Sequence, residues 1–132
     1  MSHPTLNDIH NDRMSAFTRM LGVEVVSLDQ DGCSMRLEIG PQHLNAGGGV
    51  HGGVTFSLLD SAMGAAVYAR LDAHEATATI ECKINYTRGI IGGVVECRAK
   101  VVHSGARTMV VDGEAWQDGA LVAKCLGTFA RI

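Results

Sequence analysis

The residues that could do chemistry gather in one glycine-rich stretch that ends in a carboxylate. The stretch covers residues 45–60 and reads NAGGGVHGGVTFSLLD. Gly52 and Gly53 lie where a helix is expected to begin, so free backbone N–H groups and the positive end of the helix dipole meet there. Because glycine has no Cβ atom, a ligand oxygen can approach this backbone closely. The two glycines indicate an oxyanion hole, although they would also suit a plain tight turn into a buried helix.

Asp60 is the second chemical group of this stretch. It is expected about two turns into the same helix, where Phe56, Ser57, Met63 and Gly64 share its face. An ionised carboxylate in such surroundings is costly unless it is paired or hydrated, and desolvation raises its pKa. We interpret Asp60 as a candidate general base or nucleophile. The alternative is a carboxylate on a solvated stripe, or one that makes a structural hydrogen bond.

His51 and Asn45 lie in the loop before this helix. His51 is best suited to orient the loop, and Asn45 is a common turn residue. No second histidine or carboxylate lies at metal-ligand spacing from His51, and the other histidines are scattered along the chain. No metal site is therefore expected.

Two familiar motifs that would point to other functions are not supported by the sequence. Residues 47–52 match GxGxxG, but they do not lie in a βαβ unit, which argues against a dinucleotide site. No GxSxG elbow occurs, and the serines near Asp60 have no recognisable base, which disfavours a serine hydrolase.

The elements that must position these residues follow from the period of the apolar residues. Helical spacing predicts a short helix that Asp12 opens and Gly22 closes, and a long helix over residues 54–70 that is apolar nearly all round. Strand-like alternation over residues 23–39 predicts a hairpin that turns at residues 29–32.

The second half of the chain alternates in four runs, which predicts an antiparallel meander. The runs cover residues 77–87, 94–103, 108–116 and 121–132. The order of elements gives an α+β fold in which one antiparallel sheet wraps around a central helix. We expect one domain over residues 1–132, with a flexible N-terminus over residues 1–12.

Composition limits the function classes. The chain has 132 residues and a net charge of -3, so it has no bulk attraction for nucleic acid or anionic lipid. Its longest apolar stretch is too short to span a membrane and is interrupted by polar residues. The N-terminus has no signal-peptide pattern, so we expect a cytoplasmic protein. The four cysteines form no CxxC pair and fall in apolar positions, which predicts buried thiols.

Both faces of the last two runs carry apolar residues, for example Val111 against Val110 and Phe129 against Val122. A sheet that packs a helix on one face and water on the other alternates more cleanly. This pattern predicts that another subunit covers the second face or an edge.

Together these residues resemble the hotdog-fold thioesterases, specifically the phenylacetic-acid-degradation (PaaI-like) branch. The family pattern is an Asn, a His-Gly-Gly six residues later, and a Leu-x-Asp that ends nine residues after the His; here these are Asn45, His51 and Asp60. The resemblance covers nearly the whole chain. It implies the hotdog fold and hydrolysis of an acyl-CoA thioester, with no cofactor.

The resemblance also implies roles for individual residues. Asp60 corresponds to the carboxylate that activates water or attacks the thioester carbonyl itself. Gly53, and with it Gly52, corresponds to the backbone N–H that polarises this carbonyl. His51 and Asn45 correspond to residues that position the thioester and the attacking water.

Further residues are assigned to the substrate. Thr79 corresponds to a hydroxyl residue that holds the nucleophilic water and comes from the neighbouring subunit. Phe56 and Met63 are expected to line an acyl pocket for aryl or medium-chain groups. Arg88 and Arg107 are candidates to meet the phosphates of coenzyme A. The resemblance further implies a homodimer or homotetramer with active sites at the dimer interface.

Two other functions stay open at this point. One is a hotdog hydratase or dehydratase that acts on an acyl thioester, and the other is a non-catalytic acyl-CoA-binding domain. The spacing from His51 to Asp60 favours hydrolysis over the first, and an acid within an apolar helix argues against the second.

Overall fold

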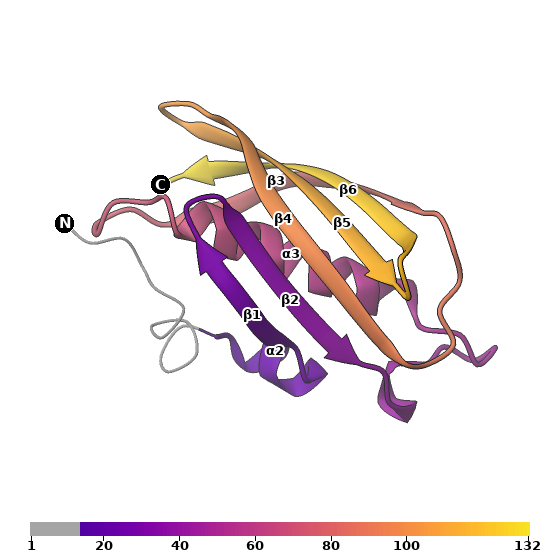
Figure 1. Ribbon diagram of the computed structural model, residues 1–132. Helices are drawn as coiled ribbons and strands as arrows, with labels where there is room; N and C mark the ends of the chain where they lie inside the picture. Colours follow the sequence, from indigo (N-terminus) through magenta and orange to yellow (C-terminus); the bar gives the residue numbers. More distant parts are fainter. Residues whose placement is uncertain (1–13) are drawn as a thin grey trace.

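Six antiparallel strands curve around one long helix in the computed structural model, which describes residues 14–132 (Figure 1). The short helix α2, Ala16–Leu21, lies beside the first strands. The Ser15 side chain caps α2 by accepting a hydrogen bond from the Thr18 N–H, and Gly22 ends it with a φ of 85°. Because Ser15 occupies the cap position, the helix begins later than the start predicted at Asp12. Asp12 and the predicted flexible N-terminus lie outside the described residues.

The first two strands form the predicted hairpin. Strand β1, Glu24–Asp29, pairs with β2, Gly32–Glu38, and the turn between them uses Asp29 Oδ1 as an acceptor for the N–H groups of Asp31 and Gly32. A 3-10 turn, η2 (Pro41–His43), follows. Its His43 is fully buried and bonds Gly40 N–H and Leu21 O, so this histidine has a structural role.

The remaining strands do not form a simple meander. Strands β4 (Val94–Ser104), β5 (Thr108–Gln117) and β6 (Ala120–Arg131) are consecutive neighbours, but β3 (Thr77–Tyr86) pairs with β6. The sheet order is β1-β2-β4-β5-β6-β3. The prediction was wrong here because alternation shows which face of a strand is buried, but not which strand is its neighbour. Strand β3 is therefore an edge strand.

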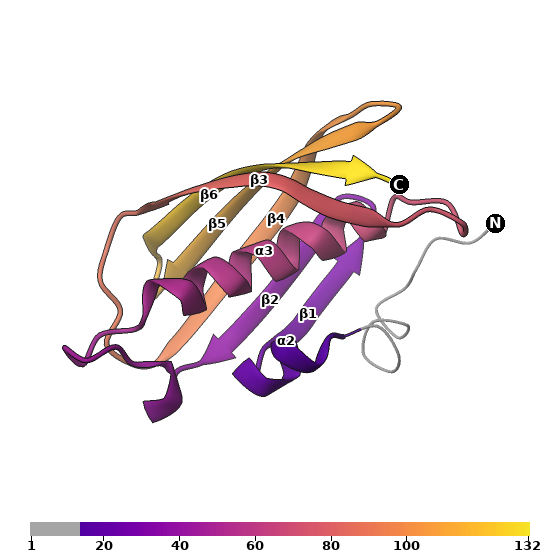
Figure 2. The ribbon, with the colours of Figure 1, turned by 180° about the vertical axis from the view of Figure 1, so that it is seen from behind.

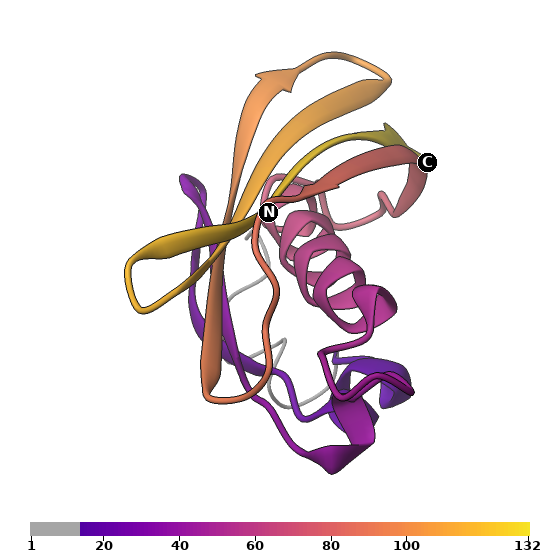
Figure 3. The same ribbon diagram turned by 90° about the vertical axis from the view of Figure 1, so that its right-hand side faces the viewer.

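Helix α3, Gly52–Tyr68, crosses the concave face of the sheet, as Figure 2 shows from behind and Figure 3 shows from the side. It begins two residues before the predicted start. The face that packs on the sheet is buried, with residues such as Leu58, Ala62 and Met63 in the core. The opposite face is half-buried and carries Asp60, so the helix is less enclosed than its composition predicts.

The apolar residues on both faces of β5 and β6 have two different explanations. Val122 is buried together with Ala123, because the pairing of β5 with β6 shifts register between Ala115 and Trp116. Leu126 and Trp116 do lie on the outer face of the sheet, where they are exposed.

The sequence predicts buried thiols, and this holds for three of the four cysteines. Cys33, Cys97 and Cys125 are buried, and Cys82 is half-buried. Within residues 14–132, no helix is both long enough and apolar enough to cross a membrane.

Candidate active site

The start of α3 presents two backbone donors with different environments. His51 is the N-cap, and its Nδ1 accepts a 2.9 Å hydrogen bond from the Gly53 N–H. The Gly52 N–H finds no acceptor among residues 14–132. On the other side of the same residue, Tyr86 Oη donates to Gly52 O at 2.6 Å. The donor that is open to a ligand is therefore the Gly52 N–H, whereas the resemblance put Gly53 first.

Asn45 is engaged in its own loop. Its Oδ1 accepts hydrogen bonds from the N–H groups of Gly47 (2.9 Å) and Gly49 (3.2 Å), and its backbone N–H donates to Gly49 O. In the described chain, Asn45 thus acts as a turn residue that closes the loop before His51.

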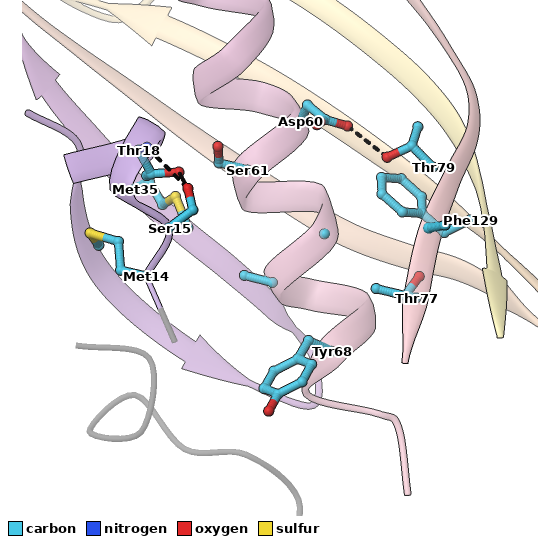
Figure 4. A pocket seen from close by; sticks show the side chains of 13 residues that line it. Met14, Ser15, Thr18, Met35, Asp60, Ser61, Tyr68, Thr77, Thr79 and Phe129 are labelled. Carbon is cyan, nitrogen blue, oxygen red and sulfur yellow. Dashed lines mark hydrogen bonds between the residues drawn. The ribbon is translucent and has the colours of Figure 1, made fainter. Parts of the chain in front are cut away.

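Asp60 lies at the wall of a cavity between α2, α3 and β3 (Figure 4). Its Oδ1 accepts a 3.1 Å hydrogen bond from Thr79 Oγ1. Burial raises the pKa of the Asp60 carboxyl above its ordinary value, and the bond from Thr79 partly opposes this shift. A carboxylate whose pKa is raised by burial in a cavity wall is suited to accept a proton from water.

Within one chain, Thr79 therefore bonds Asp60 directly, whereas the resemblance implies that the Thr79 hydroxyl of a neighbouring subunit holds the water. The register of β3 on β6 shifts between Thr79 and Glu81, directly beside this contact. Such a bulge changes the direction of nearby side chains and is common next to active sites.

The cavity has a volume of about 440 Å³ and mixed walls. Its larger apolar side chains come from α2 and its approach, from β2, from the end of α3 and from β6. They are Met14, Met35, Tyr68 and Phe129, and Figure 4 shows how they surround the cavity. Hydroxyls of Ser15, Thr18, Ser61 and Thr77 belong to lining residues as well.

The two residues expected to line the acyl pocket do not line this cavity. Met63 is fully buried in the core, and a Cβ atom at Gly127 would lie 2.7 Å from Met63 Cε. Phe56 is half-buried on α3, one turn before Asp60. The helical period that placed Met63 beside Asp60 could not show that its side chain turns toward the sheet.

A second cavity, of about 400 Å³, lies at the start of α3. Gly52, Tyr86 and Arg88 contribute to its wall. The connection over residues 87–93 is held here because Val50 N–H donates to Ile90 O at 2.7 Å. Arg107 is exposed between β4 and β5 and lines neither cavity.

The two cavities have no lining residue in common. Asp60 belongs to the first and Gly52 to the second, so these two residues of one chain line different spaces. Within residues 14–132, no group of three or more His, Cys, Asp or Glu side chains gathers where it could hold a metal ion.

Comparisons with known proteins agree with this geometry. Residues 47–124 match the family model of the thioesterase superfamily, and the chain belongs to that family. A sheet of this order around one helix is the hotdog fold that was expected, and the chain is a thioester hydrolase by class.

Several relatives extend over most of the chain. The acyl-coenzyme A thioesterase PaaI of Escherichia coli is 33% identical over 119 residues, which cover 86% of this chain and 81% of PaaI. The structure of the conserved protein PA5202 from Pseudomonas aeruginosa is 41% identical, with a TM-score of 0.87 over 90% of this chain and 95% of that one. A mutant of the phenylacetic acid degradation protein PaaI from Thermus thermophilus is 31% identical, with a TM-score of 0.83 over 89% of this chain and 100% of that one.

Proposed function

We propose that this protein hydrolyses acyl-CoA thioesters to the free acid and coenzyme A. The observation that carries the proposal is Asp60, a carboxylate with a raised pKa in the wall of a largely apolar cavity. A domain that only binds acyl-CoA gains nothing from a destabilised acid at this place. The relationship to an acyl-coenzyme A thioesterase supports the same substrate class.

In the proposed reaction, Asp60 takes a proton from water, and the resulting hydroxide attacks the thioester carbonyl carbon. The carbonyl oxygen becomes an oxyanion and accepts a hydrogen bond from the Gly52 N–H at the positive end of α3. The tetrahedral intermediate then collapses, the C–S bond breaks, and the thiolate takes up the proton from Asp60. Direct attack by Asp60, with hydrolysis of the resulting anhydride, is the alternative first step.

One chain does not bring these groups together. Asp60 lies eight positions after Gly52, which corresponds to about 12 Å along the axis of α3. A general base must lie within hydrogen-bond reach of the water, and the water about 3 Å from the carbonyl carbon. We infer that Asp60 of one chain acts on a thioester held at Gly52 of a second copy.

The edge strand β3 supports such a homodimer. An unpaired edge offers its backbone groups to another strand, and β3 exposes Ile80 (57%) and Tyr86 (53%) beside this edge. Pairing of β3 with β3 of a second copy would continue the sheet and bring the two helices close to each other. The exposed Trp116 and Leu126 on the outer face offer a further contact that would make a homotetramer.

The acyl group would occupy the cavity beside Asp60. Its apolar walls, formed by Met14, Met35 and Phe129, suit an aryl or medium-chain acyl group. The phosphates of coenzyme A would lie toward Arg88 at the second cavity. Arg107 faces neither cavity and is not part of this proposal.

The test is thiol release from a panel of acyl-CoAs that runs from acetyl through decanoyl to phenylacetyl, benzoyl and hydroxybenzoyl. Wild type is compared with Asp60→Asn, which keeps the shape of the side chain, and with Asp72→Asn, an exposed acid beyond the end of α3. We expect wild type and Asp72→Asn to release thiol and Asp60→Asn to lose at least about 10²-fold in kcat. If no thioester is cleaved but acyl-CoAs raise the Tm, the binding-domain function replaces this proposal.

A further inference from the structure

The Gly52–Gly53 peptide group is held at both of its polar ends. Tyr86 Oη donates a 2.6 Å hydrogen bond to its carbonyl oxygen, Gly52 O. Its amide, Gly53 N–H, donates a 2.9 Å hydrogen bond to His51 Nδ1. A peptide group is planar and rigid, so the three residues form one continuous chain of hydrogen bonds from β3 to the N-cap of α3.

We propose that Tyr86 is a positioning residue for thioester hydrolysis, because its hydroxyl holds the Gly52–Gly53 peptide and through it orients both Gly52 and His51. This inference rests on the proposed function for its catalytic consequence. The hydrogen-bond chain itself can be tested without any turnover.

The first effect of this chain of hydrogen bonds is on His51. A hydrogen bond to a peptide carbonyl polarises the peptide and strengthens the bond that its N–H donates. His51 Nδ1 is the acceptor of that bond, so a neutral His51 ring carries its proton on Nε2. Tyr86 therefore favours the tautomer in which His51 Nε2 carries the proton and can donate a hydrogen bond.

The second effect is on Gly52 itself. Tyr86 fixes the carbonyl of Gly52, and this fixes the direction of the peptide that follows the open Gly52 N–H. The approach is close, since a Cβ atom at position 52 would lie 3.0 Å from Tyr86 Oη and 3.2 Å from Tyr86 Cζ, so a larger residue here would make the Tyr86 side chain shift. An oxyanion donor contributes most when it is held in place before the reaction.

Tyr86 is suited to donate throughout the neutral pH range. Burial raises the pKa of its hydroxyl above the ordinary value of tyrosine, so the group stays protonated. No proton moves along these hydrogen bonds in this proposal, because Tyr86 acts only by the direction and polarity of the bond that it donates.

The variant that tests the proposal is Tyr86→Phe, which removes the hydroxyl and keeps the ring. Its matched control is Ser57→Ala. Ser57 Oγ donates a 2.6 Å hydrogen bond to Gly53 O, which belongs to the next peptide along the same turn of α3. The control therefore removes an equally short hydroxyl-to-carbonyl bond without touching the Gly52–Gly53 peptide.

Two measurements are made on both variants and on wild type. The first is kcat and KM with the acyl-CoA that wild type cleaves best. The second is the amide ¹H shift of Gly53 together with the ¹⁵N shifts of the His51 ring by NMR. We expect Tyr86→Phe to lower kcat about 10-fold and to change KM by less than about 2-fold. This fall in kcat is smaller than the 10²–10³-fold fall that follows the loss of a whole oxyanion donor. We also expect the Gly53 amide to move upfield and the His51 ring to lose its preference for the Nε2–H tautomer, while Ser57→Ala leaves both signals and kcat unchanged.

Equal kcat and unchanged His51 ring shifts in Tyr86→Phe would overturn the proposal. A parallel rise in KM for both variants would show that Tyr86 is only a structural support, which also contradicts it. If wild type cleaves no thioester, the proposed function fails, but the NMR measurement still decides whether Tyr86 orients His51. Should Tyr86→Phe not fold, 3-fluorotyrosine at position 86 provides a stronger donor and must move the Gly53 amide downfield.

Discussion

Thr79 Oγ1 lies 3.1 Å from Asp60 Oδ1, and this hydrogen bond joins the middle of α3 to the edge strand β3. It links the candidate base to the strand that we propose as the dimer interface. The bond favours the ionised form of Asp60, whereas burial disfavours it. The pKa of Asp60 is thus set by two opposed effects, of which burial is the larger.

Removal of the Thr79 hydroxyl should raise the pKa of Asp60 further. In Thr79→Val the carboxylate loses its hydrogen bond but keeps its burial, so we expect the acid limb of the kcat/KM profile to move to higher pH. The measurement is the pH dependence of thiol release. Thr128→Val is the control, because it removes a hydroxyl bond to another carboxylate, Glu81, on the same pair of strands. An acid limb at the same pH in Thr79→Val and wild type would contradict this role of Thr79.

Asp60 should also destabilise the folded protein at neutral pH. Its pKa is raised in the folded state, so folding disfavours the charged form, and this cost is present above the folded pKa. We expect Asp60→Asn to raise Tm by about 2 °C near pH 7.5, which corresponds to about 0.5 kcal/mol for a partly exposed acid. The gain should shrink as the pH falls through the folded pKa toward the ordinary value, since wild-type Asp60 is then protonated as well.

The measurement is calorimetry on Asp60→Asn and wild type from pH 4 to pH 8. Asp72→Asn serves as the control for removal of a charge that lies outside the cavity. A lower Tm for Asp60→Asn at pH 7.5 would mean that the charged carboxylate stabilises the fold, contrary to the burial argument.

The sequence alone was enough to predict most elements and the fold class. The alternation that buries Cys33, Met35 and Leu37 is visible in the sequence, and so is the hairpin at Asp118–Gly119, where both residues take positive φ. These features are local, because each depends on residues that are close together in the chain. The place of β3 beside β6 is not local, and the sequence did not indicate it.

The candidate site was predicted in part for the same reason. Asp60 and the glycines at the start of α3 were found from their types and spacing. The orientation of the His51 ring decides which backbone N–H is open. Its Nδ1 accepts a hydrogen bond from the Gly53 N–H, and the Gly52 N–H stays available to a ligand. Other residues of the site come from strands that are distant in the sequence from residues 45–60. They are Met35 and Phe129 in the cavity wall and Tyr86, whose hydroxyl donates to Gly52 O. No short motif marks such residues.

Gly52 allows a direct test of the oxyanion donor. Its position is the first of α3, where proline is well tolerated, and His51 has a ψ of 134° that suits a residue before proline. Gly52→Pro removes the N–H, whereas Gly52→Ala adds a Cβ atom at the same place and keeps the N–H. Both variants press on Tyr86, so their difference reports the N–H.

We expect kcat of Gly52→Pro to be about 10²–10³-fold below that of Gly52→Ala, with a smaller difference in KM. Steady-state thiol release gives both constants, and circular dichroism confirms that both variants keep α3. If the two variants have the same kcat, another donor stabilises the oxyanion, and the Gly53 N–H after rotation of His51 becomes the next candidate.

Assembly of the active site from two chains can be tested by mixing inactive variants. Asp60 and Gly52 of one chain line different cavities, and the proposed site pairs Asp60 of one chain with Gly52 of the other. A heterodimer of Asp60→Asn with Gly52→Pro then has one site with both changes and one site with neither. We expect the purified heterodimer to recover about half of the wild-type kcat, whereas each parent homodimer stays inactive. If Asp60 and Gly52 of the same chain formed the site, every site in the heterodimer would carry one change. Thiol release that stays at the level of the parents would therefore contradict the shared site, provided that the tagged heterodimer is shown to be intact.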